Sequence, residues 1–450
     1  MTSKRKYFGT DGIRGAYDSP TMCPDFARAV GVALARYMAE TCGEARHCVL
    51  IGRDTRGSGP ALVQALAEGL AAARADAIDA GVAPTPAIAL AIPAASASMG
   101  IAVTASHNLG SDNGIKLFSA KALKLTDEVE LAIETYIDAA LVAPPPYPAA
   151  KLTPMDAATF YRRRMAKVLP LHALKGWKVA VDCANGAATF TTPAVLRGYG
   201  AEVLAAGDEP DGANINQGVG SEHPKVLRAL VHKSGARIGI ANDGDADRVL
   251  LCDENADILD GDELLAMIGL HLLAKGTLAK NTLVATVMSN LGLDEALEAA
   301  GGRVERVDVG DRHILESMLA NGFNFGGEAS GHLIFKDIST TGDGLLAALQ
   351  VLNIMFETGR PLSELRHALT LWPQRKKNLK VREKLPLASL SGWAEGIAEI
   401  EKTLCKGRLL VRYSGTEPKI RLLAEAKDPA KADAAMAALE ALVRQHLQVL

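Results

Sequence analysis

The sequence lacks a strong charge of either sign. Its 450 residues include 49 lysines and arginines against 52 aspartates and glutamates, which gives a net charge of −3. Proteins that bind nucleic acids or anionic membranes usually show a basic excess, so this balance indicates neither partner. Hydrophobic residues make up 48% and charged residues 22% of the chain, as in ordinary globular proteins. At roughly 150 residues per domain, the length predicts about three domains, with two or four also compatible.

The sequence also lacks paired cysteines. No two of its six cysteines stand in a Cys-x-x-Cys pattern, so neither a zinc knuckle nor a redox-active pair is indicated. Scattered single cysteines are typical of a reducing compartment, and we expect them to be small core or surface residues. They are Cys23, Cys42, Cys48, Cys183, Cys252 and Cys405.

A long uninterrupted hydrophobic stretch is absent as well. The longest uncharged run covers residues 80–111, but Pro84, Pro86 and Pro93 interrupt it. Because these prolines disfavour a membrane-spanning helix, we expect a buried strand, a helix and a loop there. Residues 1–7 are polar and basic with no apolar stretch behind them, so no signal peptide is predicted. We expect a cytoplasmic protein that binds neither membranes nor nucleic acids, and its oligomeric state stays open.

The chain does contain a repeated alternation of short apolar strands and amphipathic helices. Such strands predict a mixed or parallel sheet with both faces covered. The pattern starts three times, which predicts three similar α/β domains. The expected strands cover residues 48–52, 99–104, 114–118, 178–182, 237–241, 249–252 and 282–287, and the expected helices cover residues 60–74, 261–274 and 342–357.

A smaller unit follows Pro373. Its expected strands, residues 409–412 and 420–424, precede an alanine-rich helix that begins at Pro429, which predicts an α+β domain. The proline-rich residues 144–148 mark the clearest domain boundary. We therefore predict four domains, which cover residues 1–148, 149–255, 256–372 and 373–450.

A candidate nucleophile lies in Thr104-Ala-Ser-His-Asn108, directly after a predicted buried strand. A serine hydroxyl becomes reactive only where a base, a positive field or a metal activates it. His107 and the basic Lys116 lie near Ser106 in sequence, whereas the Gly-x-Ser-x-Gly pattern of α/β-hydrolases is absent. Ser106 is therefore a candidate, although the same residues would also form an ordinary structural turn.

Three carboxylates alternate in Asn242-Asp-Gly-Asp-Ala-Asp-Arg248, between two apolar strands. Carboxylates held this close repel one another without a cation, and hard oxygen ligands suit Mg²⁺. An EF-hand is excluded, because Arg248 occupies the position that requires glycine and the flanking elements are strands. The loop predicts a magnesium site, with a solvated acidic turn as the alternative.

A glycine-rich stretch, Gly326-Gly-Glu-Ala-Ser-Gly-His332, offers two side chains for a polar ligand. Glu328 supplies an acceptor and Ser330 a donor, and together they could bracket sugar hydroxyls. A purely structural turn is the alternative.

The fourth candidate loop is Arg412-Tyr-Ser-Gly-Thr-Glu-Pro-Lys-Ile-Arg421. Two arginines enclose Ser414, Gly415 and Thr416, and guanidinium, hydroxyl and backbone donors together form a phosphate cradle. A polar hairpin without a ligand is the alternative.

Together and in this order, the four loops resemble those of the α-D-phosphohexomutase family, over essentially the whole chain. Tyr7-Phe-Gly-Thr-Asp-Gly-Ile-Arg-Gly15 and Thr340-Thr-Gly-Asp-Gly344 are similar, more narrowly, to the bacterial phosphoglucosamine mutases. The resemblance implies four domains around a central cleft, each of which contributes one loop. It also implies an isomerase that interconverts glucosamine 6-phosphate and glucosamine 1-phosphate for UDP-N-acetylglucosamine and peptidoglycan precursor synthesis. The reaction would pass through a phosphoserine enzyme and a bisphosphate, which would also act as activator.

The resemblance further implies roles for individual residues of this sequence. Ser106 would carry the phosphoryl group, and Lys116 would act as a general acid/base. On physical grounds we expect an amine near cationic partners and Mg²⁺ to have a lowered pKa and to act as a base toward the attacking hydroxyl. The other catalytic residues would be Arg14, His107 and Arg248; the ligands of one Mg²⁺ would be Ser106, Asp243, Asp245 and Asp247; Glu328 and Ser330 would contact the sugar, and Arg412, Ser414, Gly415, Thr416 and Arg421 the phosphate.

Four positions depart from the family pattern. Leu109, Ala246, Ala329 and Tyr413 stand where proline, glycine, glutamine and proline are usual. None of these changes removes a charged or metal-binding group, so we expect the chemistry to survive. The nearest alternative is a phosphomannomutase/phosphoglucomutase of the same superfamily. A metal-dependent phosphatase and a non-catalytic sugar-phosphate-binding protein are the alternatives from other classes.

Overall fold

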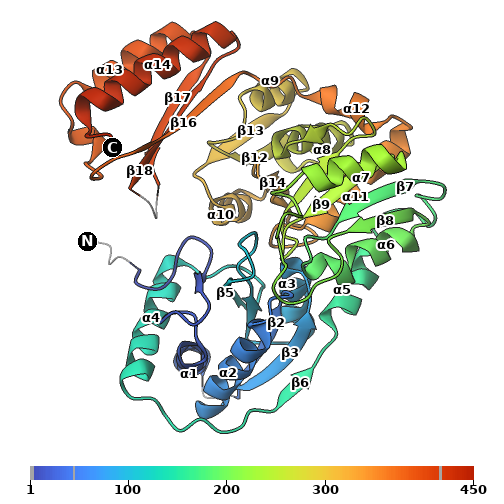
Figure 1. The fold of residues 1–450 in the computed structure, drawn as a ribbon, viewed down its shortest axis with the longest axis vertical. Coiled ribbons are helices and arrows are strands. Elements are labelled where there is room, and N and C mark those ends of the chain that lie inside the picture. Colours follow the sequence, from blue (N-terminus) through green and yellow to red (C-terminus); the bar gives the residue numbers. More distant parts are fainter. Residues whose placement is uncertain (1–4, 44–45, 415–417) are drawn as a thin grey trace. The chain divides into compact units, whose positions relative to one another are not determined.

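The computed structural model describes residues 5–43, 46–414 and 418–450. The chain forms two compact units. The first comprises Met1–Met288 and Ala300–Ala368, and the second comprises Ser289–Ala299 and Leu369–Leu450. Three β-sheets belong to the first unit and one to the second (Figure 1).

The first sheet has six strands, in the order β1-β5-β4-β2-β3-β6. The strands β4, β2, β3 and β6 are parallel, whereas β5 runs antiparallel to both of its neighbours, so the sheet is mixed. The strands are β1 (Ile13–Ala16), β2 (Cys48–Arg53), β3 (Asp76–Val82), β4 (Met99–Val103), β5 (Asp112–Ser119) and β6 (Leu152–Pro154).

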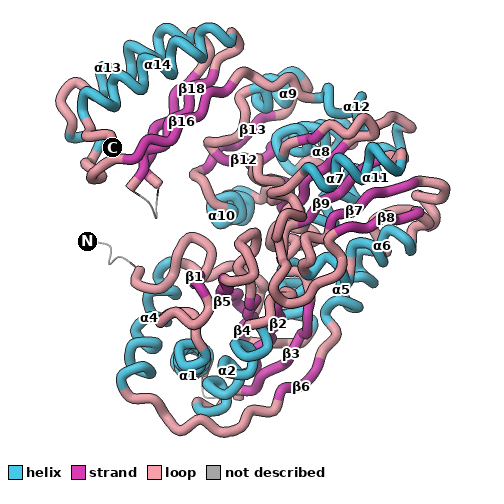
Figure 2. The backbone as a smooth tube through the Cα atoms, in the orientation of Figure 1, coloured by secondary structure: helices cyan, strands magenta, loops and turns pink. Residues whose placement is uncertain are grey.

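Helices cover both faces of this sheet (Figure 2). Alternate side chains of a strand point to opposite faces. In β2, Val49 and Ile51 pack into the core formed with three of the helices, whereas Gly52 lies against Ile88 of the fourth helix. The three helices on the first face are α1 (Pro24–Cys42), α2 (Gly59–Ala72) and α4 (Asp127–Val142), and the fourth is α3 (Thr85–Ala94).

The second sheet has the strand order β11-β10-β9-β7-β8. Its strands β9, β7 and β8 are parallel, and the antiparallel β10 and β11 extend them. The strands are β7 (Lys178–Asp182), β8 (Glu202–Ala206), β9 (Ile238–Asn242), β10 (Val249–Cys252) and β11 (Ile258–Leu259), and the accompanying helices are α5 (Ala157–Met165), α6 (Thr192–Gly198) and α7 (Lys225–Ser234).

The third sheet has the order β13-β12-β14-β15, of which the first three strands are parallel. Two helices of this domain each begin at an aspartate cap. Asp260 forms a capping box with Glu263 at α8, and the Asp343 carboxylate accepts the Leu346 amide at α11. The elements are β12 (Thr282–Thr286), β13 (Arg303–Val307), β14 (Phe325–Gly327), β15 (Leu333–Phe335), α8 (Gly261–Ala274), α10 (Asp311–Asn321), α11 (Gly344–Thr358) and α12 (Leu362–Leu365).

The second unit is built on a three-stranded antiparallel sheet, β16-β18-β17. Its core joins Leu422 of the sheet to Trp393 and Leu439 of two helices. The elements are α9 (Gly292–Ala299), β16 (Gln374–Lys380), α13 (Trp393–Leu404), β17 (Arg408–Tyr413), β18 (Lys419–Glu425) and α14 (Pro429–His446).

These three mixed sheets and the smaller α+β sheet confirm the predicted fold class. The predicted strands 178–182 and 249–252 and the predicted helix 261–274 match β7, β10 and α8 residue for residue. The uncharged run 80–111 contains α3 and β4, and no helix of the described residues is long and apolar enough to cross a membrane. The four domain boundaries stay predictions, although β6 pairs with the first sheet beyond residue 148.

Asp343 gives a test of this packing. Its carboxylate is buried, accepts a hydrogen bond from the Tyr161 hydroxyl of α5, and has a second oxygen without a partner among the described residues. Burial raises the pKa of Asp343 from 3.8 to about 6. The folded state therefore binds this proton more tightly than the unfolded state, and its contribution to stability is lost as the pH rises through about 6.

We expect thermal unfolding midpoints to reveal this proton. Between pH about 4 and 6, the wild type should lose up to about 3 kcal/mol of stability relative to Asp343→Asn. The matched control is Asp156→Asn at the exposed cap of α5, where hydrogen bonds from Thr159 lower the pKa of the carboxyl below 3.8. The contribution of Asp156 is therefore lost only as the pH falls below about 4, and wild type and Asp156→Asn should give parallel curves between pH about 4 and 6. Parallel curves for wild type and Asp343→Asn would contradict a buried, proton-binding Asp343.

Candidate active site

Ser106 lies in a buried turn directly after β4. Its backbone has φ +52°, a left-handed conformation that is uncommon for a residue other than glycine. The Ser106 hydroxyl donates a 2.7 Å hydrogen bond to Asp243, and its amide donates to the Thr104 hydroxyl at 2.9 Å. The turn thus directs the predicted nucleophile at the first of the three predicted metal ligands.

The acidic loop, residues 242–248, connects the antiparallel strands β9 and β10. Four consecutive backbone carbonyls of the loop accept hydrogen bonds: Asp243 accepts from Ala246 within the loop, and Gly244, Asp245 and Ala246 accept from residues 187, 85 and 344. Two of these donors, Thr85 and Gly344, are the first residues of α3 and α11. Elements of all three sheets therefore fix the loop.

Gly244 allows the acidic loop to approach Ser106 closely. A Cβ atom at this position would lie 2.6 Å from the Ser106 carbonyl oxygen and 2.7 Å from the Asn216 side chain. Both distances are shorter than real Cβ contacts, so any larger residue would push the two loops apart.

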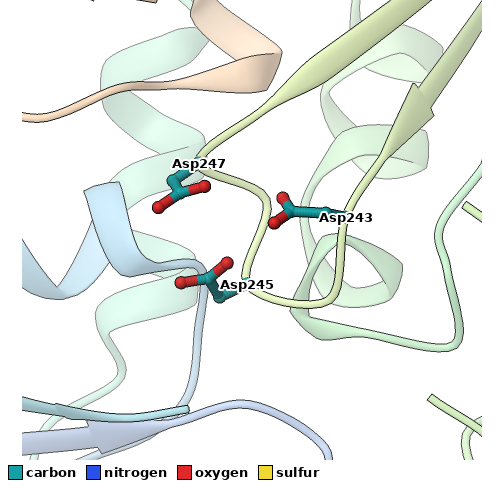
Figure 3. Close-up of side chains that lie close together, drawn as sticks. All are labelled: Asp243, Asp245 and Asp247. Carbon is teal, nitrogen blue, oxygen red and sulfur yellow. The ribbon is translucent and has the colours of Figure 1, made fainter. Parts of the chain in front are cut away.

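The three carboxylates of the acidic loop converge on one point (Figure 3). Asp243, Asp245 and Asp247 are buried, and one oxygen of each lies within 4.8 Å of the others. Asp245 Oδ1 and Asp247 Oδ1 accept no hydrogen bond from any residue that the structure describes. Burial and the two neighbouring carboxylates raise the pKa of Asp243 well above its usual range. Buried, unpartnered oxygens of this kind fit a hard divalent cation.

Lys116 lies at the edge of this cluster, on β5, and is buried. Its Nζ lies 2.8 Å from Asp245, 3.1 Å from Asp247 and 3.2 Å from Asp11. Although burial opposes it, these carboxylates raise the pKa of Lys116 well above its usual range. The expectation of a lowered pKa is therefore wrong for this arrangement, because the three carboxylates outweigh both burial and the positive charge of Arg14.

His107 follows the serine and has the opposite electrostatic environment. Its Nδ1 lies 3.4 Å from Ser106 Oγ. Burial and the positive charges of Arg248 and Arg14 lower the pKa of His107, so its imidazole is neutral near pH 7. A neutral imidazole beside a serine hydroxyl can accept a proton.

Arg248 and Arg14, both predicted catalytic residues, also lie in this region. The Arg248 amide donates to Asp243 at 3.2 Å, and its guanidinium Nε lies 4.0 Å from Asp247. Despite burial, Asp243 and Asp247 raise the pKa of Arg248. Arg14 pairs with Asp11, which also contacts Lys116. The structure therefore brings Ser106, His107, Lys116, both arginines and the acidic residues into one cluster, in which Ser106, Lys116 and the triplet are buried and His107 and the arginines are half-buried.

The glycine-rich loop contributes Glu328 and Ser330 differently. Glu328 is half-buried and accepts the Gly310 amide at 3.1 Å, and its charge contributes, after Asp243 and Asp247, to the raised pKa of Arg248. Ser330 is exposed at the tip of the turn. The next residue but one, His332, is buried and lies 3.7 Å from Asp247 and 3.2 Å from Asp311. Despite burial, these two carboxylates raise the pKa of His332 to about 10.

The fourth loop belongs to the second unit. Arg412 of β17 and Arg421 of β18 are directly opposite in the sheet, and Arg421 donates to Ser414 at 3.5 Å. Like charges in directly opposite positions repel each other, and an anion between them would remove that cost. Gly415 and Thr416 lie outside the described residues. Tyr413, which stands where the family usually has proline, donates to the Leu385 carbonyl at 2.8 Å.

Comparison with known proteins decides the family. The four domain models of phosphoglucomutase/phosphomannomutase match residues 5–142, 161–257, 260–371 and 377–442. The chain belongs to this family. A phosphoglucosamine mutase of Anaeromyxobacter dehalogenans is 45% identical over 98% of this chain and 99% of its own length. Another, of Novosphingobium aromaticivorans, is 45% identical over 96% of this chain and 97% of its own.

Solved structures agree on the fold. A phosphoglucomutase/phosphomannomutase family protein of Burkholderia thailandensis superimposes with a TM-score of 0.81 at 24% identity, covering 98% of both chains. An N-acetylphosphoglucosamine mutase of Aspergillus fumigatus, solved with GlcNAc-6P and magnesium, has a TM-score of 0.63 at 18% identity, covering 99% of this chain and 96% of its own. The predicted family is confirmed, and the chain is a phosphohexomutase, an isomerase.

Several charged residues in and around this cluster are not identified by the sequence reasoning. Asp11 and His332 lie inside motifs that the sequence analysis singles out, so their position was a usable signal. Arg56 follows the buried strand β2, where loops of a parallel sheet gather. Lys124, which pairs with Asp11 and Asp311, has no such signal in the sequence.

The acidic triplet gives a test that does not depend on activity. Mg²⁺ added to chelator-treated protein should raise the thermal unfolding midpoint, because a cation relieves the repulsion among the three carboxylates. At a free Mg²⁺ concentration about 100 times its Kd, the stabilisation should reach about 2.7 kcal/mol. Calorimetric titration should give one site per chain.

Asp245→Ala should abolish both the heat of binding and the shift. The matched control is Asp211→Ala, which removes an exposed carboxylate that accepts only nearby backbone amides. This variant should bind the cation as the wild type does. Equal Mg²⁺ responses in Asp245→Ala and wild type would contradict a metal site at the triplet.

Proposed function

We propose that this phosphohexomutase interconverts glucosamine 6-phosphate and glucosamine 1-phosphate, with Ser106 as the carrier of the phosphoryl group. The observation that carries the proposal is the Ser106 hydroxyl, buried and 2.7 Å from Asp243 of a metal-competent acidic cluster. Relatives about 45% identical over nearly the whole chain carry the name phosphoglucosamine mutase, which favours glucosamine over mannose or glucose phosphates.

In the proposed reaction, one phosphoryl group moves from Ser106 to the sugar, and another moves from the sugar back to Ser106. The free hydroxyl of the sugar monophosphate attacks the phosphorus on Ser106, so a new oxygen–phosphorus bond forms and the bond to Ser106 Oγ breaks. The hydroxyl proton leaves to a neighbouring base, and a sugar bisphosphate results. After the bisphosphate turns around, its other phosphoryl group returns to Ser106 and leaves the isomeric monophosphate. Phosphoryl transfers of this kind depend mainly on positioning and electrostatics.

The acidic cluster would hold one Mg²⁺, with phosphorylated Ser106 as a further ligand. Hard carboxylate oxygens are the ligands that this ion prefers. When bound, it would offset the negative charge of the transferring phosphoryl group. Asp243, Asp245 and Asp247 would supply the protein ligands, and one oxygen each of Asp245 and Asp247 accepts no hydrogen bond from the described residues.

The basic residues around Ser106 would bind the phosphoryl group and transfer the proton of the attacking hydroxyl. Arg14 and Arg248 carry charge at any physiological pH. His107, neutral near pH 7, is suited to accept a proton. Lys116 stays our candidate general acid, since it is protonated beside Asp245 and Asp247.

The remaining loops would orient the sugar and its second phosphate. Glu328 and Ser330 would contact the hydroxyl or amino groups of the sugar. Arg412, Ser414, Gly415, Thr416 and Arg421 would hold the phosphate that is not reacting. Either phosphate of the bisphosphate must fit this cradle in turn, so a general anion site suits the reaction better than contacts specific for one sugar carbon.

We further propose a cytoplasmic setting, for which the six free thiols are the support. A bisphosphorylated sugar would load Ser106 and act as activator.

Phosphoserine mapping and a substrate panel test the function. Wild-type protein should incorporate labelled phosphate on Ser106 from glucose 1,6-bisphosphate and should isomerise glucosamine phosphate at least 10-fold faster than mannose or glucose phosphates. Ser106→Ala should lose labelling and turnover by several orders of magnitude while its unfolding midpoint stays close to wild type, because a loop hydroxyl contributes little packing. Ser111→Ala, an exposed serine nearby, is the control. Release of inorganic phosphate in stoichiometric turnover would instead indicate a phosphatase.

Arg421 tests the phosphate cradle. Arginine can pair with a phosphate through two parallel hydrogen bonds, worth about 2 to 3 kcal/mol. This contact exists in both ground and transition states, so its loss should act on KM. Arg421→Ala should raise KM by about one to two decades, and Arg421→Lys should recover only part, because an ammonium lacks the planar fork. The control is Arg444→Ala, an exposed arginine of α14 that pairs with Glu440. An unchanged KM in Arg421→Ala would assign the loop a purely structural role.

A further inference from the structure

Arg56 is a fully buried arginine that the proposed reaction does not use. It lies between β2 and α2 and is 1% exposed. Its guanidinium Nε donates to Asp54 at 2.9 Å, and both side chains of this pair have no exposed surface. A buried ion pair carries a large desolvation cost and is a weak source of net stability. Its presence behind the active site therefore needs another explanation.

The guanidinium group uses all five of its donors. Besides Asp54, it binds four backbone carbonyls that all belong to the Ser106 loop, defined here as residues 104–112. Nη2 donates to the Ser106 carbonyl at 3.0 Å and to the Asn108 carbonyl at 2.8 Å. Nη1 donates to the Leu109 carbonyl and, at 2.9 Å, to the Asp112 carbonyl.

Two neighbours reinforce the same loop. Asp54 accepts the Thr104 hydroxyl at 2.6 Å, and that hydroxyl in turn accepts the Ser106 amide. Asn216, from the second sheet's domain, donates to the carbonyls of Ser106 and Asn108 at 2.8 Å each. Both carbonyls thus bind Arg56 from one side and Asn216 from another.

These contacts explain how Ser106 keeps an unfavourable backbone. A left-handed conformation costs a non-glycine residue about 1 to 2 kcal/mol, so the surrounding structure must impose it. The Ser106 carbonyl bound to Arg56 fixes the peptide plane after Ser106, and the Ser106 amide bound to the Thr104 hydroxyl fixes the plane before it. The Ser106 hydroxyl is then left on the opposite side, directed at Asp243.

We propose that Arg56 is a positioning residue for phosphoryl transfer: it holds the Ser106 loop so that the serine oxygen stays aligned with the acidic triplet. The inference rests on the proposed role of Ser106 as phosphoryl carrier. Arg56 contacts no substrate, since it is buried behind the loop. Its effect passes through the backbone of residues 106–112, and so it acts on the transfer step rather than on sugar binding.

Arg56→Lys is the first test. An ammonium keeps the charge opposite Asp54 but has only three donors in a tetrahedral arrangement, so it cannot satisfy four carbonyls and a carboxylate. We expect kcat for glucosamine 6-phosphate to fall about 100-fold, the penalty typical of a misplaced reacting group, with KM within twofold of wild type. Hydrogen exchange of peptides covering residues 104–112 should speed up.

Chemical rescue provides the second test. Arg56→Ala leaves a cavity shaped for guanidinium, and millimolar guanidinium chloride should restore kcat at least 10-fold. The matched control is Arg366→Ala: Arg366 also pairs with buried carboxylates and a backbone carbonyl, but at Asp253, Glu263 and Ile258. It should lower the unfolding midpoint without changing kcat, exchange at residues 104–112 or the response to guanidinium. Should Arg56→Ala not fold, Asn216→Ala removes two bonds to the same carbonyls without leaving an unpaired charge.

Labelling of Ser106 by glucose 1,6-bisphosphate separates the two proposals. If wild-type protein takes no label, the proposed function fails and the inference falls with it. If the wild type is labelled, and Arg56→Lys and Asn216→Ala are labelled as fast with unchanged kcat, the inference alone is overturned. If Arg366→Ala lowered kcat as much as an Arg56 variant of equal stability does, the inference would also be overturned, and Arg56 would have a structural role only.

Discussion

The repulsion among three buried carboxylates is the constraint on which the rest of the site depends. Asp243, Asp245 and Asp247 bring oxygens within 4.8 Å of one another in a region with almost no exposed surface. In such surroundings like charges repel far more strongly than in water. Lys116 and His332 offset part of this charge through direct contacts, and the oxygens that remain unpartnered among the described residues suit a cation. The fold therefore holds a cluster of carboxylates whose remaining negative charge suits a bound metal ion.

Backbone hydrogen bonds, more than side chains, fix the geometry of this site. The carbonyls of Gly244, Asp245 and Ala246 bind the amides of Ala187, Thr85 and Gly344, which belong to different parts of the first unit. Helix N-termini favour such partners because their first amides lack acceptors within the helix. Since the acidic loop is tied to three sheets at once, a shift of one sheet would move the metal ligands relative to Ser106. The position of the loop is thus a property of the whole unit.

The sequence predicts the strands, helices and candidate loop residues that local patterns encode. Apolar periodicity identifies β7, β10 and α8 to the residue, and the composition of the loops singles out Ser106 and the acidic triplet as candidates, which the fold brings together. It does not predict contacts between distant segments, because these depend on how the sheets are assembled. The raised pKa of Lys116 arises from Asp11, Asp245 and Asp247, more than a hundred positions away in each case, and the antiparallel direction of β5 is what brings Lys116 to them.

Two departures from the family pattern, Ala246 and Leu109, show the same difference between local sequence patterns and contacts with distant segments. Ala246 stands where glycine is usual and has φ +58°, a conformation that costs an alanine about 1 to 2 kcal/mol. Its methyl group is buried, and its carbonyl accepts the first amide of α11, so packing and hydrogen bonding offset that cost. Leu109, in place of proline, is exposed, but its carbonyl still binds Arg56. At both positions the backbone contact is kept while the side chain changes. The geometry of these two loops in this chain therefore depends on carbonyl partners such as Arg56 and α11, and a comparison of side chains alone overlooks them.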